Sequence, residues 1–131
     1  MMARMPTILQ NHYVLAVPDA RASARFYVDA LGFRVVAEPE GWVFVSKDQC
    51  LIMLGSCPDD LPPGELGCHS YFGYLVVDDV DRYYAELAEK DVTPLGKLTD
   101  EPWGMREFGV RTPDGHRIKI GQVLSDGNED A

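Results

Sequence analysis

Hydrophobic positions along the chain form two successive runs with the same order of periodicities. The first run opens at residues 11–17, which are apolar on both faces and predict a strand. Apolar residues then recur at three- and four-residue steps from Ala22 to Leu31, predicting a helix that starts after Asp19 and stops at Gly32. Three short strands are predicted next, at residues 33–37, 42–46 and 50–54.

The second run repeats this order, and the two halves register when residues 17–19 are laid on residues 77–79, an offset of 60. It predicts a strand at 70–77, a helix whose apolar stripe includes Val80, Tyr83 and Leu87, and strands at 92–97, 105–111 and 116–123. Residues 112–115, Thr-Pro-Asp-Gly, predict a hairpin turn, because proline presets φ and glycine accepts a positive φ.

This order predicts an α+β fold of two tandem β-α-β-β-β modules that form a curved mixed sheet around a cavity. We expect one domain over residues 1–131, with module one at about 10–55, a linker at 56–68, module two at about 69–123 and a tail at 124–131. One such unit cannot bury its sheet face alone. Whether the modules pair within one chain or between two chains stays open.

Composition narrows the classes of partner. Hydrophobic residues make up 46% of the 131 residues, which is enough for a core. The formal charge of −9 argues against nucleic acid and anionic membranes, and it leaves a cationic ligand as an option. Three cysteines without C-x-x-C spacing argue against a disulfide framework or a zinc site, and they indicate the cytoplasm.

Several motifs are shared with one known group of proteins. They are S-A-R-F-Y at 23–27 with L-G-F at 31–33, V-V-D-D-V at 76–80, and T-P-D-G-H at 112–116. They resemble the vicinal oxygen chelate superfamily of glyoxalases, extradiol dioxygenases and bleomycin-resistance proteins. G-W-V-F at 41–44 and W-G-M-R-E-F at 103–108 look most similar to the bleomycin-resistance branch. The resemblance covers residues 11–122 and implies a homodimer.

The resemblance also implies where a metal ion would bind. Enzymes of the family hold a divalent ion with one ligand from the first and one from the last strand of each module. The matching positions here are His12, Met53, Phe72 and Lys119. Phenylalanine and methionine do not bind a hard cation, and a protonated lysine repels one. We therefore predict no metal site, no cofactor and no catalytic residue, with an enzyme disfavoured.

The same positions predict a ligand-binding wall. Strand alternation adds Val14, Tyr74 and Arg117 to the face that holds them. An apolar and aromatic lining suits a flat organic molecule, and the carboxylates of Glu101 and Glu107 favour a cationic one. The predicted ligand-binding residues are His12, Trp42, Phe44, Met53, Phe72, Tyr74, Trp103, Glu107, Arg117 and Lys119.

We therefore expect a non-catalytic protein that binds or sequesters a small, antibiotic-like organic molecule. One alternative is a metal-dependent glyoxalase-like lyase, isomerase or dioxygenase with a degenerate metal site, in which His12 is the evident reactive group. A second alternative is a pocket that is vestigial or regulatory, since a fold does not dictate a function.

Overall fold

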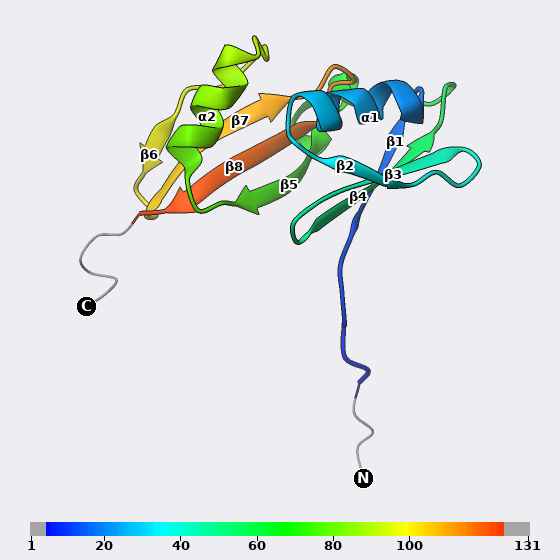
Figure 1. Cartoon of the computed structure of the whole chain (residues 1–131), viewed down its shortest axis with the longest axis horizontal. Coiled ribbons are helices and arrows are strands. Elements are labelled where there is room, and N and C mark those ends of the chain that lie inside the picture. The colour runs from blue at the N-terminus through cyan, green and yellow to red at the C-terminus, as the bar shows by residue number, and fades with distance from the viewer. Residues whose placement is uncertain (1–4, 125–131) are drawn as a thin grey trace.

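The computed structural model describes residues 5–124 and contains two modules of the same construction (Figure 1). Module one consists of β1 (Tyr13–Val17), α1 (Ala20–Asp29), β2 (Arg34–Ala37), β3 (Trp42–Lys47) and β4 (Cys50–Ser56). Module two consists of β5 (Tyr71–Val76), α2 (Val80–Glu89), β6 (Thr99–Glu101), β7 (Met105–Arg111) and β8 (Arg117–Val123). The short 3₁₀ segment η1 (Pro63–Ser70) lies between them. The predicted α+β fold with tandem modules is confirmed.

Each helix begins where the sequence pattern indicates, at an aspartate that caps it. The carboxylate of Asp19 accepts hydrogen bonds from the backbone N–H groups of Arg21 and Ala22, at 3.0 and 3.4 Å. Asp79 accepts one from the N–H of Arg82 at 3.1 Å. After α1 the chain turns at Gly32, whose φ of 86° lies in the left-handed region that glycine adopts without strain.

The strands form two four-stranded mixed sheets in the orders β1-β4-β3-β2 and β5-β8-β7-β6. In each sheet the first and last strands of the module pair in parallel, and the other pairs are antiparallel. One face of each sheet packs against the helix of its own module, where Val45, Ile52, Ile118 and Ile120 are fully buried. The opposite face, which we call the open face, carries exposed side chains such as Val14 and Tyr74.

The two modules meet where Tyr13 on β1 packs edge-on against Phe72 on β5, with 5.7 Å between ring centroids. Buried residues of both modules belong to one hydrophobic cluster. Polar contacts join them as well: the hydroxyl of Ser23 donates to the carboxylate of Asp114, and the hydroxyl of Tyr83 donates to the carbonyl of Leu31. Lys90, which follows α2, donates from Nζ to the carbonyl of Asp29 at 3.0 Å and so caps the C-terminus of α1.

One prediction about local structure was wrong. The strand expected at 92–97 is absent, and within it only Leu95 forms an isolated bridge, to Val110. Pro94 has no N–H to donate to a ladder, so the edge strand β6 forms later, at Thr99–Glu101. The segment predicted as a linker, residues 56–68, lies between β4, which extends to Ser56, and β5, and it contains most of η1, whose turns are interrupted at Gly67 (φ 60°).

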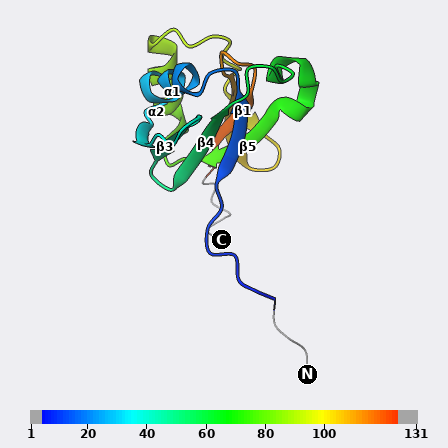
Figure 2. The ribbon, with the colours of Figure 1, turned by 90° about the vertical axis from the view of Figure 1, so that its right-hand side faces the viewer.

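Residues 5–12, which we call the N-terminal arm, leave the body of the molecule before β1 (Figures 1 and 2). Their side chains are exposed, and Ile8 and Leu9 have exposed fractions of 83% and 87%. Burying such side chains is favourable, so the arm is suited to contact another surface. Within residues 5–124, no helix is both long enough and apolar enough to cross a bilayer.

Candidate functional site: the open faces of the two sheets

The open face of module one is an apolar and aromatic surface. Trp42 on β3 lies over the backbone of Gly55 on β4, where an added Cβ would come within 3.0 Å of the indole ring. Phe44 packs edge-on against Trp42, with 6.1 Å between ring centroids. Met53 pairs with Phe44 on one side and with Val14 on the other, so these side chains form a row across the sheet. The predicted residues of module one are thus brought together.

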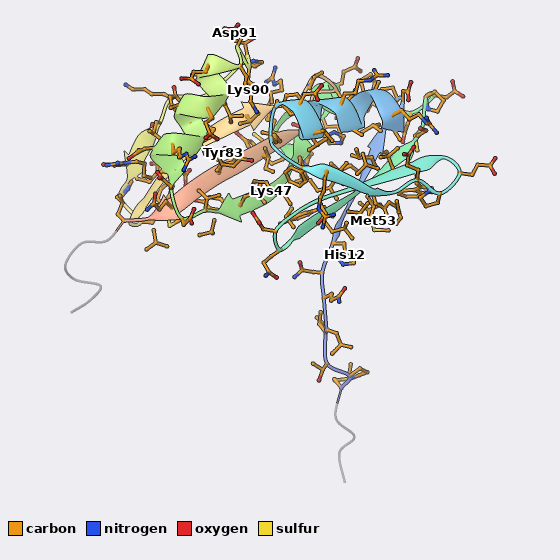
Figure 3. The ribbon with its side chains drawn as sticks, viewed as in Figure 1. His12, Lys47, Met53, Tyr83, Lys90 and Asp91 are labelled. Atoms are coloured by element: carbon orange, nitrogen blue, oxygen red, sulfur yellow. The ribbon has the colours of Figure 1, made fainter. Side chains whose placement is uncertain are left out.

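His12 lies where the N-terminal arm joins β1, and its alternation with Val14 directs it to the side of the open face. Figure 3 shows it near β4, which carries Met53. The imidazole is exposed, and its Nε2 lies 3.1 Å from Oε1 of Gln10. Its one hydrogen-bond partner among the described residues is therefore on the arm, with no carboxylate positioned to make it a general base.

The open face of module two is organised around the carboxylate of Glu107, which is only 4% exposed. The hydroxyl of Tyr74 donates to its Oε1 at 2.7 Å, and Lys119 Nζ lies 3.3 Å from its Oε2. Burial alone would raise the pKa of Glu107, but the hydrogen bonds from Tyr74 and Lys119, with a contribution from the Trp103 indole, outweigh it and lower the pKa. Burial and the neighbouring carboxylate raise the pKa of Tyr74 to about 12.

Arg117 and Lys119 both lie over the ring of Tyr71, at the start of β5. Their charged groups are 5.4 and 6.0 Å from the ring centroid, which are cation–π distances. Sequence reasoning missed Tyr71, because it assigned the face of β5 by strict alternation. It also missed Arg111, although the turn at 112–115 implies that Arg111 and Arg117 face each other across the hairpin.

Phe72 does not lie on the open face, contrary to the expectation from alternation. The pairing of β5 with β8 shifts between Tyr71 and Gly73, so the strand is irregular at Phe72. The ring of Phe72 instead packs edge-on against Tyr13 and His116, with 5.7 Å between centroids in both pairs, and joins the margin of the core. Its predicted place on the same face as Tyr74 was therefore wrong, while its part in ligand binding stays a prediction.

The positions that hold a metal ion in family enzymes do not fit one here. Met53 offers only a thioether, Phe72 is turned toward the core, and Lys119 places a cation beside Glu107. Among residues 5–124, no three His, Cys, Asp or Glu side chains are grouped as a metal site would require. The buried carboxylate of Glu107, which could otherwise bind a metal ion, is paired with the ammonium of Lys119.

Within one chain the predicted residues line different hollows. Tyr74 lines a cleft between the modules with a volume of about 280 Å³, together with Tyr13, Cys50 and Tyr83. Trp42 borders a second hollow beside α1, and Arg117 a third at the end of the β7–β8 hairpin. The predicted residues therefore form two clusters, one on each open face. None of these three hollows contains residues of both clusters.

Comparison with known proteins agrees with this architecture. The sequence profile of the Glyoxalase/Bleomycin resistance protein/Dioxygenase superfamily matches residues 9–120, and the chain belongs to this family. The chain is similar to a bleomycin resistance protein of Geobacillus stearothermophilus, at 27% identity over 89% of this chain and 98% of that protein.

Two solved structures illustrate the similarity in fold. TnmS3, an antibiotic binding protein from Streptomyces sp. CB03234, is 28% identical, with a TM-score of 0.71 over 90% of this chain and 99% of that chain. The bleomycin-binding protein of Streptomyces verticillus, solved with copper(II)-bleomycin, is 22% identical, with a TM-score of 0.69 over 93% of this chain and 100% of that chain. The latter likeness concerns the fold alone.

Proposed function

We propose that this protein binds a planar, antibiotic-like organic molecule on its open faces and sequesters it without chemical conversion. The observation that carries the proposal is the row of Trp42, Phe44 and Met53, which is partly exposed on the face of the sheet opposite α1. Aromatic rings held edge-to-face present a rigid surface for stacking at little entropic cost. The relatives that are bleomycin resistance or antibiotic binding proteins support a role of this kind.

The absence of a suitable reacting group from the two clusters favours binding over catalysis. Tyr74 and Lys119 lower the pKa of Glu107, so its carboxylate is a weak base near neutral pH. The residues at the family's metal positions do not supply a ligand set for a divalent ion. The lyase, isomerase and dioxygenase alternatives would each require one of these groups to act on the bound molecule.

A fluorescence titration tests the proposal. The chain has two tryptophans, Trp42 and Trp103, and the Trp103→Phe variant leaves Trp42 as the reporter on module one. We expect saturable quenching by some members of a panel of planar antibiotics of positive, neutral and negative charge. Phe44→Ala should weaken the binding about fivefold or more, because a lost aromatic contact is worth about 0.5–1.5 kcal/mol beyond burial.

Val35→Ala is the matched control for Phe44→Ala. Val35 is a partly exposed residue that pairs with buried Val45, so it faces the helix side of the same sheet. Its substitution should leave quenching unchanged. Equal affinity of the Phe44→Ala and Val35→Ala variants, or no quenching by any planar compound, would refute the proposed function.

We further propose that the binding unit is a homodimer in the cytoplasm. Two open faces with exposed Val14, Val76 and Val123 leave apolar area that a second copy would cover. The N-terminal arm carries Ile8 and Leu9 away from its own body, which suits contact with a partner chain. The three cysteines are unpaired thiols, as in reducing compartments.

Sedimentation velocity of the Ile8→Asp/Leu9→Asp variant tests the dimer. We expect the wild-type protein to sediment as a dimer and the variant to shift toward monomer. Leu61→Asp, at an exposed apolar residue of the segment before η1, is the control and should remain dimeric. A wild-type monomer at all concentrations would contradict the assembly.

A further inference from the structure

The open face of module two ends in a pocket whose charged side chains are all cationic. The pocket has a volume of about 260 Å³ and is formed by β5, β7, β8 and the segment before β6. Its lining contains two arginines and no carboxylate, although the chain has 21 acidic and only 12 basic residues. The lining residues are Tyr71, Pro94, Gly96, Gly109, Val110, Arg111 and Arg117.

Arg111 and Arg117 are directly opposed in the antiparallel pair of β7 and β8. Like charges in such positions destabilise a sheet. Neither guanidinium is in a salt bridge with any described residue. The Nε of Arg117 is buried, and no described residue accepts a hydrogen bond from it. An anion between the two guanidinium groups would remove the repulsion and accept charge-assisted hydrogen bonds from their terminal N–H groups.

Two glycines leave part of the pocket lining without side chains. Gly109 on β7 faces open space, since a Cβ added there would meet no atom within 4 Å. Gly96 packs directly on the backbone of Gly109, and its N–H donates to the carbonyl of Gly109 at 2.8 Å. Tyr71 forms one wall, and its ring already lies beneath the guanidinium of Arg117 at 5.4 Å. Lys119, the pairing partner of Gly109, lies 6.0 Å from the same ring, with its charge paired to Glu107.

We propose that this pocket takes the anionic edge of a planar aromatic ligand, either a carboxylate or an ionised phenol. The inference rests on the proposed function and names the chemical class of its ligand. It replaces the expectation of a cationic ligand, because the carboxylate of Glu107 is already engaged by Tyr74 and Lys119. The flat part of the molecule would lie over Gly109, with its anionic edge held by Arg117.

Three probes with one ring system separate charge from stacking: 2-naphthoate, 2-naphthalenemethanol and 2-naphthylmethylammonium. Isothermal titration calorimetry of the wild-type protein should show 2-naphthoate binding about tenfold more tightly than the alcohol, since a charge-assisted hydrogen bond is about twice as strong as a neutral one. The ammonium should bind more weakly than the alcohol. The preference for the carboxylate should shrink as salt is raised, because part of the pocket is exposed.

Arg117→Gln and Arg111→Gln should each remove most of the preference for 2-naphthoate over the alcohol. Arg25→Gln, at an exposed arginine of α1 outside this pocket, is the control and should keep it. Equal affinity for carboxylate and alcohol, or a preference that survives both substitutions, would overturn the anionic subsite and leave the proposed function standing. If none of the three probes binds at millimolar concentration, the anionic subsite is overturned, and the proposed function is decided by the titration with planar antibiotics.

Discussion

Replacing Tyr74 with phenylalanine tests whether the hydrogen bond to Glu107 holds a buried carboxylate in its charged form. The substitution removes one donor, at 2.7 Å, and leaves the 4% exposed carboxylate with Lys119 at 3.3 Å. A hydrogen bond to a charged group contributes about 1.5–3 kcal/mol, so we expect the free energy of unfolding to fall by about 2 kcal/mol at pH 7. For a chain of this length, that corresponds to a melting temperature lower by about 7 °C.

The pH dependence carries the sharper test. In the wild-type protein the pKa of Glu107 lies below its ordinary value of 4.5, so the carboxylate stabilises the fold above pH 4.5 and loses this contribution as the pH falls through the lowered pKa. Without Tyr74 the opposing effect of burial raises that pKa. The stability difference between the two proteins should therefore be largest above pH 5 and shrink, as the pH falls through the lowered pKa of Glu107, to that of a hydrogen bond to a neutral acceptor.

Thermal unfolding of the wild-type, Tyr74→Phe, Glu107→Gln and double-variant proteins at pH 3 to 8 measures this coupling. We expect the Tyr74→Phe substitution to cost about 1 kcal/mol in the Glu107→Gln background, because a neutral amide accepts a weaker hydrogen bond. An effect of Tyr74→Phe that is the same at pH 3 and pH 7 would refute the reasoning.

Three further results are expected. Gly115→Ala should lower the free energy of unfolding by about 3 kcal/mol or more, because Gly115 has φ 102° and an added Cβ would come 2.3 Å from the nitrogen of Gly64. Gly104→Ala is the control and should cost only about 1 kcal/mol, because Gly104 has φ 86° but open space around it. Urea denaturation measures both changes. Urea unfolding followed through Trp42 alone and Trp103 alone should give coincident transitions, since one hydrophobic cluster spans both modules, and separated midpoints would mean two units. In an alkaline spectrophotometric titration, Tyr74→Phe should show one fewer tyrosine that ionises at unusually high pH, because the pKa of Tyr74 is raised to about 12. Neutral Tyr74 stabilises the fold below its unfolded pKa of 10, and this contribution disappears as the pH rises through about 12.

The order of elements was predictable because its signals are local. The caps at Asp19 and Asp79 and the change between helical and strand periodicity are set by neighbouring residues. The strand expected at 92–97 from its apolar residues does not form, because Pro94 has no N–H to donate to a strand ladder. This difference changes an edge of the sheet and leaves the arrangement of the modules unaffected.

The candidate site was predictable only as far as strand alternation holds. Alternation correctly grouped Tyr74, Arg117 and Lys119 on one face. It misplaced Phe72, because a single irregular residue in β5 reverses the facing of the side chains before it. The ion pair of Glu107 with Lys119 depends on the register of β7 against β8, which no local pattern fixes, so the charge of the pocket emerged only from the structure.

Native mass spectrometry of the protein with the tightest binder from the antibiotic panel tests the central claim most directly. The ligand is then released, and its molecular mass is measured. The account predicts complexes of two chains with stoichiometric ligand, and a released molecule of unchanged mass after prolonged incubation. A ligand that returns with an altered mass, or that turns over repeatedly per chain, would contradict sequestration and establish an enzyme in its place.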